Sequence, residues 1–295
     1  MTMRERFYEL AARALEEDER VAIVTAEIGS GELPRHPRHF NVGIREQLMI
    51  GVAAGLALEG MRPVAHSYTP FLVERPYEQV KLDLGHQEVG AVLVSIGASY
   101  DAARAGRTHQ APEDVAALAA LPGWTIHVPG HPDEVERLFM RALATDDRVY
   151  IRLSEEENAA RVDGDGIVVL RRGGAGTPLV LAIGPSLSET LAATVDLDVT
   201  VAYTATPRPL DGDALRALAL GTDVVLVEPY LAGTSTGEVA GILSDRPHRF
   251  LSLGVPLGEL RRYGTPAEHR AAHGLDARGI RASLARFWSL PDRVR

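Results

Sequence analysis

The chain has 295 residues, of which 45% are hydrophobic and 24% charged, a composition typical of a folded globular protein rather than a disordered or fibrous one. Its formal net charge of -9, without a basic cluster, argues against nucleic acid or an anionic membrane surface as a partner. The absence of cysteine excludes disulfides and cysteine nucleophiles, and because no apolar run approaches about 18 residues we expect a cytoplasmic protein.

Helical and strand patterns alternate along the first half of the chain. Apolar residues spaced three and four apart predict an amphipathic helix over 4–18, and a short apolar run predicts a buried strand over 21–24. The segment 46–58 is apolar nearly all round, which indicates a buried helix. Further strands are expected at 63–65, 89–96, 125–128 and 149–153, with helices at 71–84, 112–120 and 132–144. Such alternation predicts an α/β fold with a parallel sheet covered by helices.

The pattern breaks between residues 154 and 177. A charged run at 155–157, a turn at 163–166 and a glycine-rich stretch at 173–176 interrupt the alternation. We therefore expect one domain over 1–155, a linker over 156–176 and a smaller α/β domain over 177–295. In that domain we expect strands at 179–183, 199–203, 224–227 and 250–253, and a closing helix at 277–288.

The most informative passage is Phe40-Asn-Val-Gly-Ile-Arg-Glu-Gln47, which precedes the apolar helix. It places Glu46 at a strand-to-helix turn between apolar residues, where a carboxylate is partly desolvated. Taken alone, the better interpretation is a glutamate that stabilises the helix N-terminus. By the same reasoning, Tyr68, Phe71 and Tyr77 are more typical of core packing than of a binding site.

This passage resembles the pyrimidine-binding domain of the transketolase family, whose pattern is approximately Phe-x-Val-Gly-Ile-x-Glu-Gln. Segments 25–28, 67–79 and 106–114 also match in the family's order, and residues from Thr177 onward resemble its C-terminal domain. The resemblance implies a thiamine-diphosphate-binding fold, followed by a smaller transketolase C-terminal-type domain. It also implies a transferase of aldehyde or ketone residues.

The resemblance also implies roles for individual residues. Glu46 would contact the aminopyrimidine of thiamine diphosphate, and His109, in Gly-x-Thr-His-Gln, would stabilise an alkoxide or carry its proton. Ile28 would lie between the two cofactor rings, next to Glu27, where the family usually has Asp-Leu. The expected cofactor contacts are Glu27, Ile28, Tyr68, Phe71 and Tyr77.

Three departures from the family concern the substrate. Sugar-phosphate transketolases have a histidine where this chain has Gly97, an acidic pair where it has Arg104-Ala105, and often an arginine where it has Glu155. A carboxylate repels phosphate, so we expect a non-phosphorylated or amine-bearing acceptor in specialised metabolism. The alternative is an anion held by Arg75, Arg104 or Arg107.

The family's diphosphate and metal domain has no counterpart in this sequence. Gly164-Asp-Gly166 matches the start of its metal motif, but both asparagines of the chain, Asn41 and Asn158, lie upstream of it. We therefore expect no metal ligands here, and a separate N-terminal transketolase-like subunit that supplies the Mg²⁺ and diphosphate ligands within a heterotetramer of two pairs. A 2-oxoacid dehydrogenase beta-like subunit and a catalytically degenerate partner subunit remain alternatives.

Overall fold

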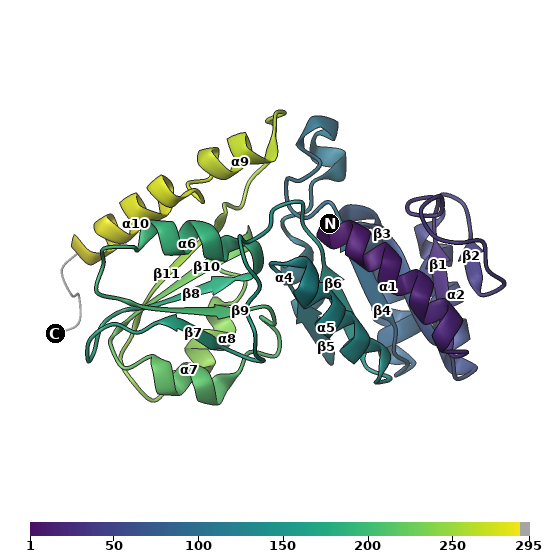
Figure 1. Ribbon diagram of the computed structural model, residues 1–295, viewed down its shortest axis with the longest axis horizontal. Coiled ribbons are helices and arrows are strands. Elements are labelled where there is room, and N and C mark those ends of the chain that lie inside the picture. The colour runs from purple at the N-terminus through teal and green to yellow at the C-terminus, as the bar shows by residue number, and fades with distance from the viewer. Residues whose placement is uncertain (290–295) are drawn as a thin grey trace.

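The computed structural model describes residues 1–289 and contains two sheets, each covered by helices (Figure 1). The first unit comprises the elements between Met3 and Arg152, and the second unit those between Val168 and Ser289. The expected mixed α/β architecture is confirmed. We propose that each unit is a domain; the last six residues of the expected second domain, 290–295, lie outside the described residues.

The first unit has a six-stranded parallel sheet of order β2-β1-β3-β4-β6-β5. Its central strands are nearly continuous apolar runs because helices bury both faces. The strands are β1 (Val21–Thr25), β2 (His39–Asn41), β3 (Arg62–Tyr68), β4 (Val92–Ile96), β5 (Trp124–His127) and β6 (Arg148–Arg152).

Two sets of helices enclose this sheet. Helices α1 (Met3–Glu17) and α5 (Pro132–Leu143) cover one face, in front of the sheet in Figure 1. Helices α2 (Glu46–Leu58) and α4 (Asp114–Ala119) cover the other. The expected helix over 71–84 is irregular: π-helical turns at Pro70–Glu74 and Val80–His86 flank the short α3 (Tyr77–Gln79).

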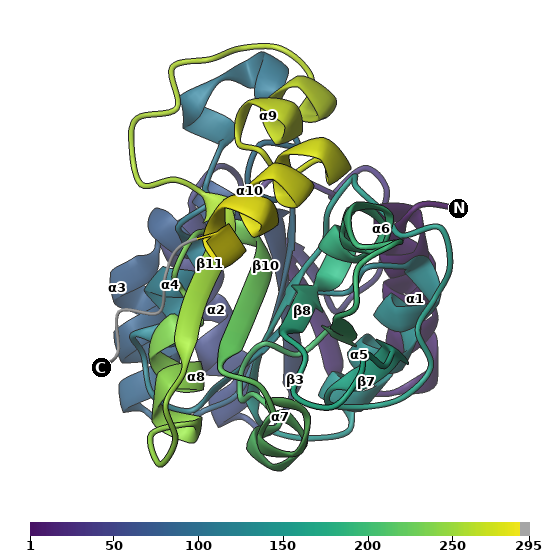
Figure 2. The same cartoon turned by 90° about the vertical axis from the view of Figure 1, so that its left-hand side faces the viewer.

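The second unit has a five-stranded sheet of order β11-β10-β8-β9-β7 (Figure 2). Its strands are β7 (Val168–Arg171), β8 (Leu179–Ile183), β9 (Thr200–Thr204), β10 (Asp223–Leu231) and β11 (Arg249–Val255). Its helices are α6 (Leu187–Ala193), α7 (Gly212–Leu218), α8 (Thr236–Ile242), α9 (Pro266–Ala272) and α10 (Ala277–Ser289). Helices α6 and α10 pack on one face of this sheet, and α7 and α8 on the other.

One element corrects the expected linker. Residues 168–171 form the edge strand β7, which pairs antiparallel with β9. The apolar residues Val168 and Val169 pack half-buried against the second unit's core, so this part of 156–176 belongs to the second sheet. The linker expectation is therefore wrong for these residues.

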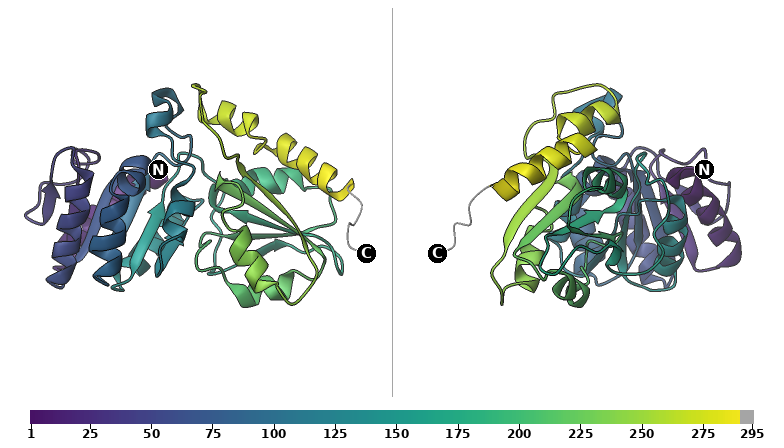
Figure 3. Two further views of the ribbon diagram at one scale, coloured as in Figure 1. Left: turned by 180° about the vertical axis from the view of Figure 1, so that it is seen from behind. Right: turned by 60° about the vertical axis from the view of Figure 1, so that its left-hand side comes forward.

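Backbone hydrogen bonds join the two units, which lie side by side when viewed from the front and from behind (Figure 3). The N–H groups of Ile126 and Val128, at the edge of the first sheet, donate to the carbonyls of Arg208 and Ala205 at 2.8 and 2.7 Å. Between residues 1 and 289, no helix is both long and apolar enough to cross a bilayer.

Candidate active site

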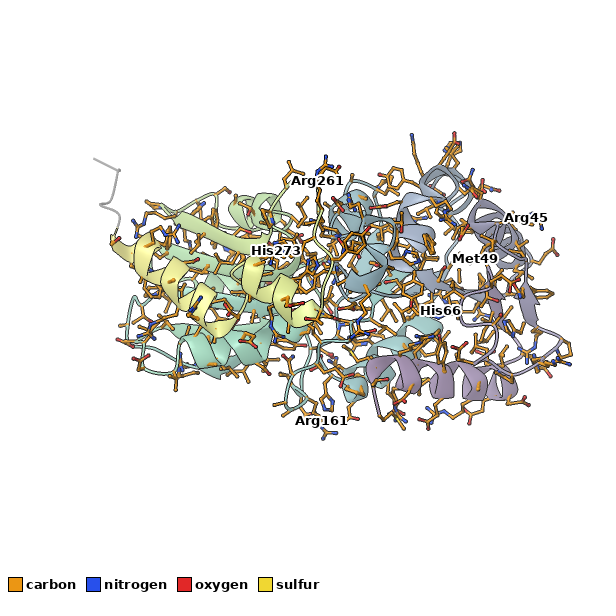
Figure 4. All side chains as sticks on the ribbon, turned by 90° about the horizontal axis from the view of Figure 1, so that it is seen from above. Arg45, Met49, His66, Arg161, Arg261 and His273 are labelled. Carbon is orange, nitrogen blue, oxygen red and sulfur yellow. The ribbon has the colours of Figure 1, made fainter. Side chains whose placement is uncertain are left out.

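Glu46 begins helix α2 and is only 2% exposed. Arg45 and Met49 mark this end of the helix in Figure 4. The Glu46 carboxylate accepts a hydrogen bond from Arg75 Nη1 at 2.6 Å, and the Arg75 guanidinium lies 4.1 Å from the centroid of the Phe71 ring. Burial of a charged group requires such a partner. The π-helical turn before Arg75 thus brings a cation and an aromatic face to one buried carboxylate.

Three rings meet beside this pair, from the end of β3, the π-helical turn and the 3-10 turn Arg107–His109. The His109 ring lies 5.0 Å from Phe71 and 5.7 Å from Tyr68, centroid to centroid, with edge-to-face geometry. Thr108 Oγ1 hydrogen-bonds to His109 Nδ1 at 2.9 Å. The structure therefore brings together three of the residues that the sequence singles out.

Gly97 occupies a position that excludes any side chain. Its φ is +74°, and a Cβ there would lie 2.3 Å from Cδ1 of Tyr68. Both the left-handed backbone and the contact with the ring demand glycine. The histidine expected from the family at this position would displace Tyr68, so its absence has a packing cause.

Gly97, Tyr68 and Glu155 line one small pocket together with Arg4. Arg4 donates from Nε to the Tyr8 hydroxyl at 3.1 Å and from Nη2 to Glu32 at 3.0 Å. Sequence reasoning missed Arg4, because nothing in the helical pattern of residues 4–18 indicates that the start of α1 reaches this pocket. The pocket is thus lined by a cation as well as by the exposed Glu155 carboxylate.

A buried carboxyl lies next to this pocket. Asp101 accepts hydrogen bonds from Ser154 Oγ at 3.1 Å and from the Glu155 N–H at 2.9 Å. Burial raises the pKa of Asp101 to about 8, against the opposing effect of the Glu155 N–H. The sequence carried no signal for this group.

The remaining predicted cofactor contacts lie at the edges of the site. Glu27 is exposed, has a φ of +70° and donates its N–H to Asn41 Oδ1 at 3.0 Å. Ile28 is half-buried and packs on the same core cluster as Tyr68. The Tyr77 hydroxyl donates to the Ala117 carbonyl at 3.0 Å, which ties that ring to α4 rather than to the three-ring group.

The two other candidate arginines differ in their surroundings. Arg107 donates to Glu113 at 2.9 Å and lies 3.6 Å from Glu259, so its charge is already balanced. Arg104 is exposed and has no hydrogen bond or ion pair within residues 1–289.

A buried polar network supports the loop after β4. Arg152 donates from Nε to Asp114 at 2.7 Å and from Nη2 to Ser99 Oγ at 2.7 Å, and both charged groups are almost fully buried. Burial is the main cause of the raised pKa of the Tyr150 phenol. The Tyr150 hydroxyl also donates a hydrogen bond to Asp114. Ser99 Oγ donates to the Pro229 carbonyl at 2.6 Å and so links this network to the second unit. Asp114 lies within a matched segment of the sequence, but its pairing with Arg152 could not be predicted from it.

Metal-ligating side chains do not converge in the described chain. Within residues 1–289, no group of three or more His, Asp or Glu side chains could hold an ion. The groups gathered here are a buried carboxylate, aromatic faces and an imidazole, which suit a heteroaromatic ring.

Residues 1–159 match the family model described as "Transketolase, pyrimidine binding domain". The chain belongs to this transketolase family. A 33.6 kDa protein of the fasciation locus of Rhodococcoides fascians, described as uncharacterized, is 49% identical over 93% of this chain and 91% of its own length. The resemblance seen in the sequence is thereby confirmed.

Other transketolase-family relatives differ in length. The 1-deoxy-D-xylulose-5-phosphate synthase of Thioalkalivibrio sulfidiphilus is 32% identical, and the match covers 87% of this chain but 41% of the synthase. A 6-deoxy-6-sulfo-D-fructose transketolase subunit of a Clostridium species is 28% identical over 94% of this chain and 95% of the subunit. The chain thus spans less than half of the synthase and nearly all of the subunit.

Solved structures agree on the fold. A protein described as a split gene transketolase, an inactive beta4 tetramer, superposes with a TM-score of 0.81 over 97% of both chains at 23% identity. Transketolase of Campylobacter jejuni superposes with a TM-score of 0.79 at 17% identity, over 97% of this chain and 46% of the enzyme. At these identities the likeness establishes the fold alone.

Proposed function

We propose that the chain is the C-terminal subunit of a two-subunit, thiamine diphosphate-dependent transferase of ketol or acyl groups. The observation that carries this proposal is the position of Glu46: a buried carboxylate at the start of α2, joined through Arg75 to Phe71, whose ring packs with those of Tyr68 and His109. Relatives named as a transketolase subunit and as a 1-deoxy-D-xylulose-5-phosphate synthase support the reaction class.

The residues of the site fit the pyrimidine half of the cofactor. Glu46 would hold a ring nitrogen of the aminopyrimidine, Tyr68 and Phe71 would offer aromatic faces to that ring, and Ile28 would support it from the side. When bound, thiamine diphosphate supplies the carbanion chemistry of the transfer. Ligands for Mg²⁺ and the diphosphate are proposed to lie on the partner subunit.

His109 is proposed to act on the substrate oxygen. Its Nδ1 is engaged by Thr108, so Nε2 is the nitrogen left to donate to, or exchange a proton with, an oxygen that gains charge. The edge-to-face contacts with Phe71 and Tyr68 hold the imidazole plane in one orientation.

The pocket beside Tyr68 supports an acceptor other than an ordinary sugar phosphate. Gly97 offers no side-chain donor, Glu155 is acidic, and Arg4 already contacts Glu32. Arg75 and Arg107 both pair with carboxylates. A non-phosphorylated or amine-bearing acceptor in specialised metabolism fits this charge balance.

The exposed face of the segment 44–58 supports a partner subunit. Ile44, Leu48 and Leu58 are 73%, 47% and 57% exposed, and the half-buried to exposed Gly51 and Gly55 lie between them. Spacings of three and four residues place Leu48, Gly51, Gly55 and Leu58 on one stripe of α2, and Ile44 lies just before the start of this helix. An apolar stripe beside Glu46 fits an interface with the N-terminal subunit in a heterotetramer, and a solved split-gene relative described as inactive is a tetramer of one subunit.

Reconstitution tests the proposal. The chain would be mixed with a transketolase-like subunit that carries the Gly-Asp-Gly motif and its downstream asparagine, and then assayed with thiamine diphosphate and Mg²⁺ against panels of ketose and 2-oxoacid donors. We expect turnover that Glu46→Gln and His109→Ala abolish and that the matched exposed variant Glu78→Gln retains. Turnover unaffected by Glu46→Gln would overturn the proposal. Carbon dioxide release from pyruvate would identify a 2-oxoacid donor.

A further inference from the structure

The loop that carries His109 is contacted by a segment of the second unit. Residues 255–275, here termed the docking segment, run from the end of β11 through α9. In Figures 1 and 2 the docking segment lies beside the short helical turns Ala103–Ala105 and Arg107–His109. Arg261, on the docking segment, lies above the junction of the two units in Figure 4.

Tyr263 of the docking segment packs directly on Gly106. A Cβ on Gly106 would lie 2.7 Å from Cε1 of Tyr263, and the φ of Gly106 is +75°. The Gly106 carbonyl accepts the N–H of His109 at 3.0 Å. The Tyr263 ring thus rests on the residue whose backbone closes the His109 turn, although 70% of its own surface is exposed.

Arg107, the residue after Gly106, makes a second contact with the docking segment. Arg107 Nε lies 3.6 Å from Glu259 of the docking segment, while Arg107 Nη2 donates to Glu113. The guanidinium therefore joins the His109 turn both to the segment before α4 and to the second unit.

The start of the loop is anchored by stacked rings. Tyr100 is 3% exposed and lies 5.5 Å from His269 with an interplanar angle of 14°, and 5.6 Å from His273. Tyr100 also forms an apolar cluster with Val255, Leu260 and Leu275. This anchor fixes the docking segment relative to the loop, so the place of Tyr263 is set by packing well away from His109.

The His109 turn has little internal support. Its own hydrogen bonds are those of two short 3-10 turns, of the neighbouring Thr108 hydroxyl, and of Arg107 to the Gln110 carbonyl and to Glu113. We propose that Tyr263 is a positioning residue, which acts through Gly106 to hold the imidazole of His109 against Phe71. The catalytic consequence rests on the function proposed above, whereas the positional claim does not.

Nuclear magnetic resonance of the full chain tests the positional claim directly. The Cε1–H signal of His109, assigned with a His109→Gln variant, is displaced by the ring currents of Phe71 and Tyr68. We expect Tyr263→Ala to lose most of that displacement and Tyr263→Phe, which keeps the ring, to retain it. Leu257→Ala is the matched control, since Leu257 lies on the same segment and is 85% exposed. An unchanged signal in Tyr263→Ala, or the same change in Leu257→Ala, would overturn the proposal.

The reconstituted enzyme provides a second readout. We expect Tyr263→Ala to lower kcat by about 10- to 100-fold with the donor KM changed less than about twofold. A misplaced catalytic group stabilises the transition state less, whereas binding of the donor substrate is little affected. Tyr263→Phe should restore the native rate. Equal rates for native protein and Tyr263→Ala would overturn the proposal. If native protein is itself inactive, the proposed function fails, and the His109 signal still decides the positional claim.

Discussion

Arg75 donates a hydrogen bond to Glu46 at 2.6 Å while its guanidinium lies over the Phe71 ring. The carboxylate is almost fully buried and the arginine is 40% exposed, so the buried acceptor is paired with a side chain that solvent reaches. One side chain thus serves both the proposed catalytic group and the aromatic face beside it.

Removal of that partner should destabilise the chain. We expect Arg75→Ala to lower the free energy of unfolding by about 1–3 kcal/mol, because a buried charged acceptor loses its donor. In a Glu46→Gln background the same substitution should cost less, since no charge remains to be balanced. Urea denaturation of the four proteins of this cycle measures both values. Equal losses of unfolding free energy in the two backgrounds would show that the Glu46–Arg75 pair does not contribute to stability.

Substitution of Gly97 should disturb the aromatic group. We expect Gly97→Ala to be destabilising by at least about 1 kcal/mol, because alanine is strained at positive φ and its Cβ would overlap Tyr68. The matched control is Gly241→Ala in α8, where no atom lies within 4 Å and the change should stabilise by about 0.5–1 kcal/mol. Thermal melting of both variants and of native protein measures the two changes in stability. A neutral Gly97→Ala would contradict the contact with Tyr68.

The buried Asp101 should make stability depend on pH. Its pKa is about 8 in the folded chain against an ordinary 3.8, so between these values the folded chain binds more protons than the unfolded one. The contribution of Asp101 to stability therefore falls as pH rises through this range. Asparagine resembles the protonated carboxyl, so we expect Asp101→Asn to gain stability over native protein from pH 5 to pH 8. Urea denaturation at both pH values checks this; a gain that is independent of pH would contradict it.

The apolar stripe of α2 should be needed for assembly. We expect Leu48→Glu to leave the melting temperature of the isolated chain nearly unchanged, because the side chain is 47% exposed, and to prevent complex formation with the partner subunit. Leu220→Glu, at a 70% exposed leucine of the second unit, is the control and should assemble normally. Analytical ultracentrifugation of each variant mixed with the partner subunit distinguishes the complex from the free chains. Normal assembly of Leu48→Glu would place the interface elsewhere.

Local patterns predicted most of the architecture. Buried parallel strands such as β1 and β4 are short apolar runs, so their hydrophobicity marks them in the sequence. Sequence patterning assigns strand β7 to the linker although 167–170 is a short apolar run, because the turn at 163–166 and the glycines of 173–176 enclose it. The π-helical turns near Arg75 are likewise invisible to a 3.6-residue periodicity.

Contacts between distant segments could not be predicted. The sequence led to Glu46, Tyr68, Phe71 and His109 through matched motifs, and the structure brings their rings and carboxylate to one place. Arg4 and Tyr263 stand in no motif, and each reaches the site through packing of α1 or of the second unit. Their positions depend on tertiary structure, which residue spacing does not encode.

The central claim is that this chain contributes the catalytic glutamate of a shared thiamine diphosphate site. Exchange of the C2 proton of the bound cofactor for deuterium, measured in the reconstituted complex, tests this without knowledge of the substrates. The account predicts rapid exchange with native protein and a rate lower by about 100-fold or more with Glu46→Gln, as expected when a catalytic proton-transfer group is lost. Exchange at the native rate in Glu46→Gln would contradict the account.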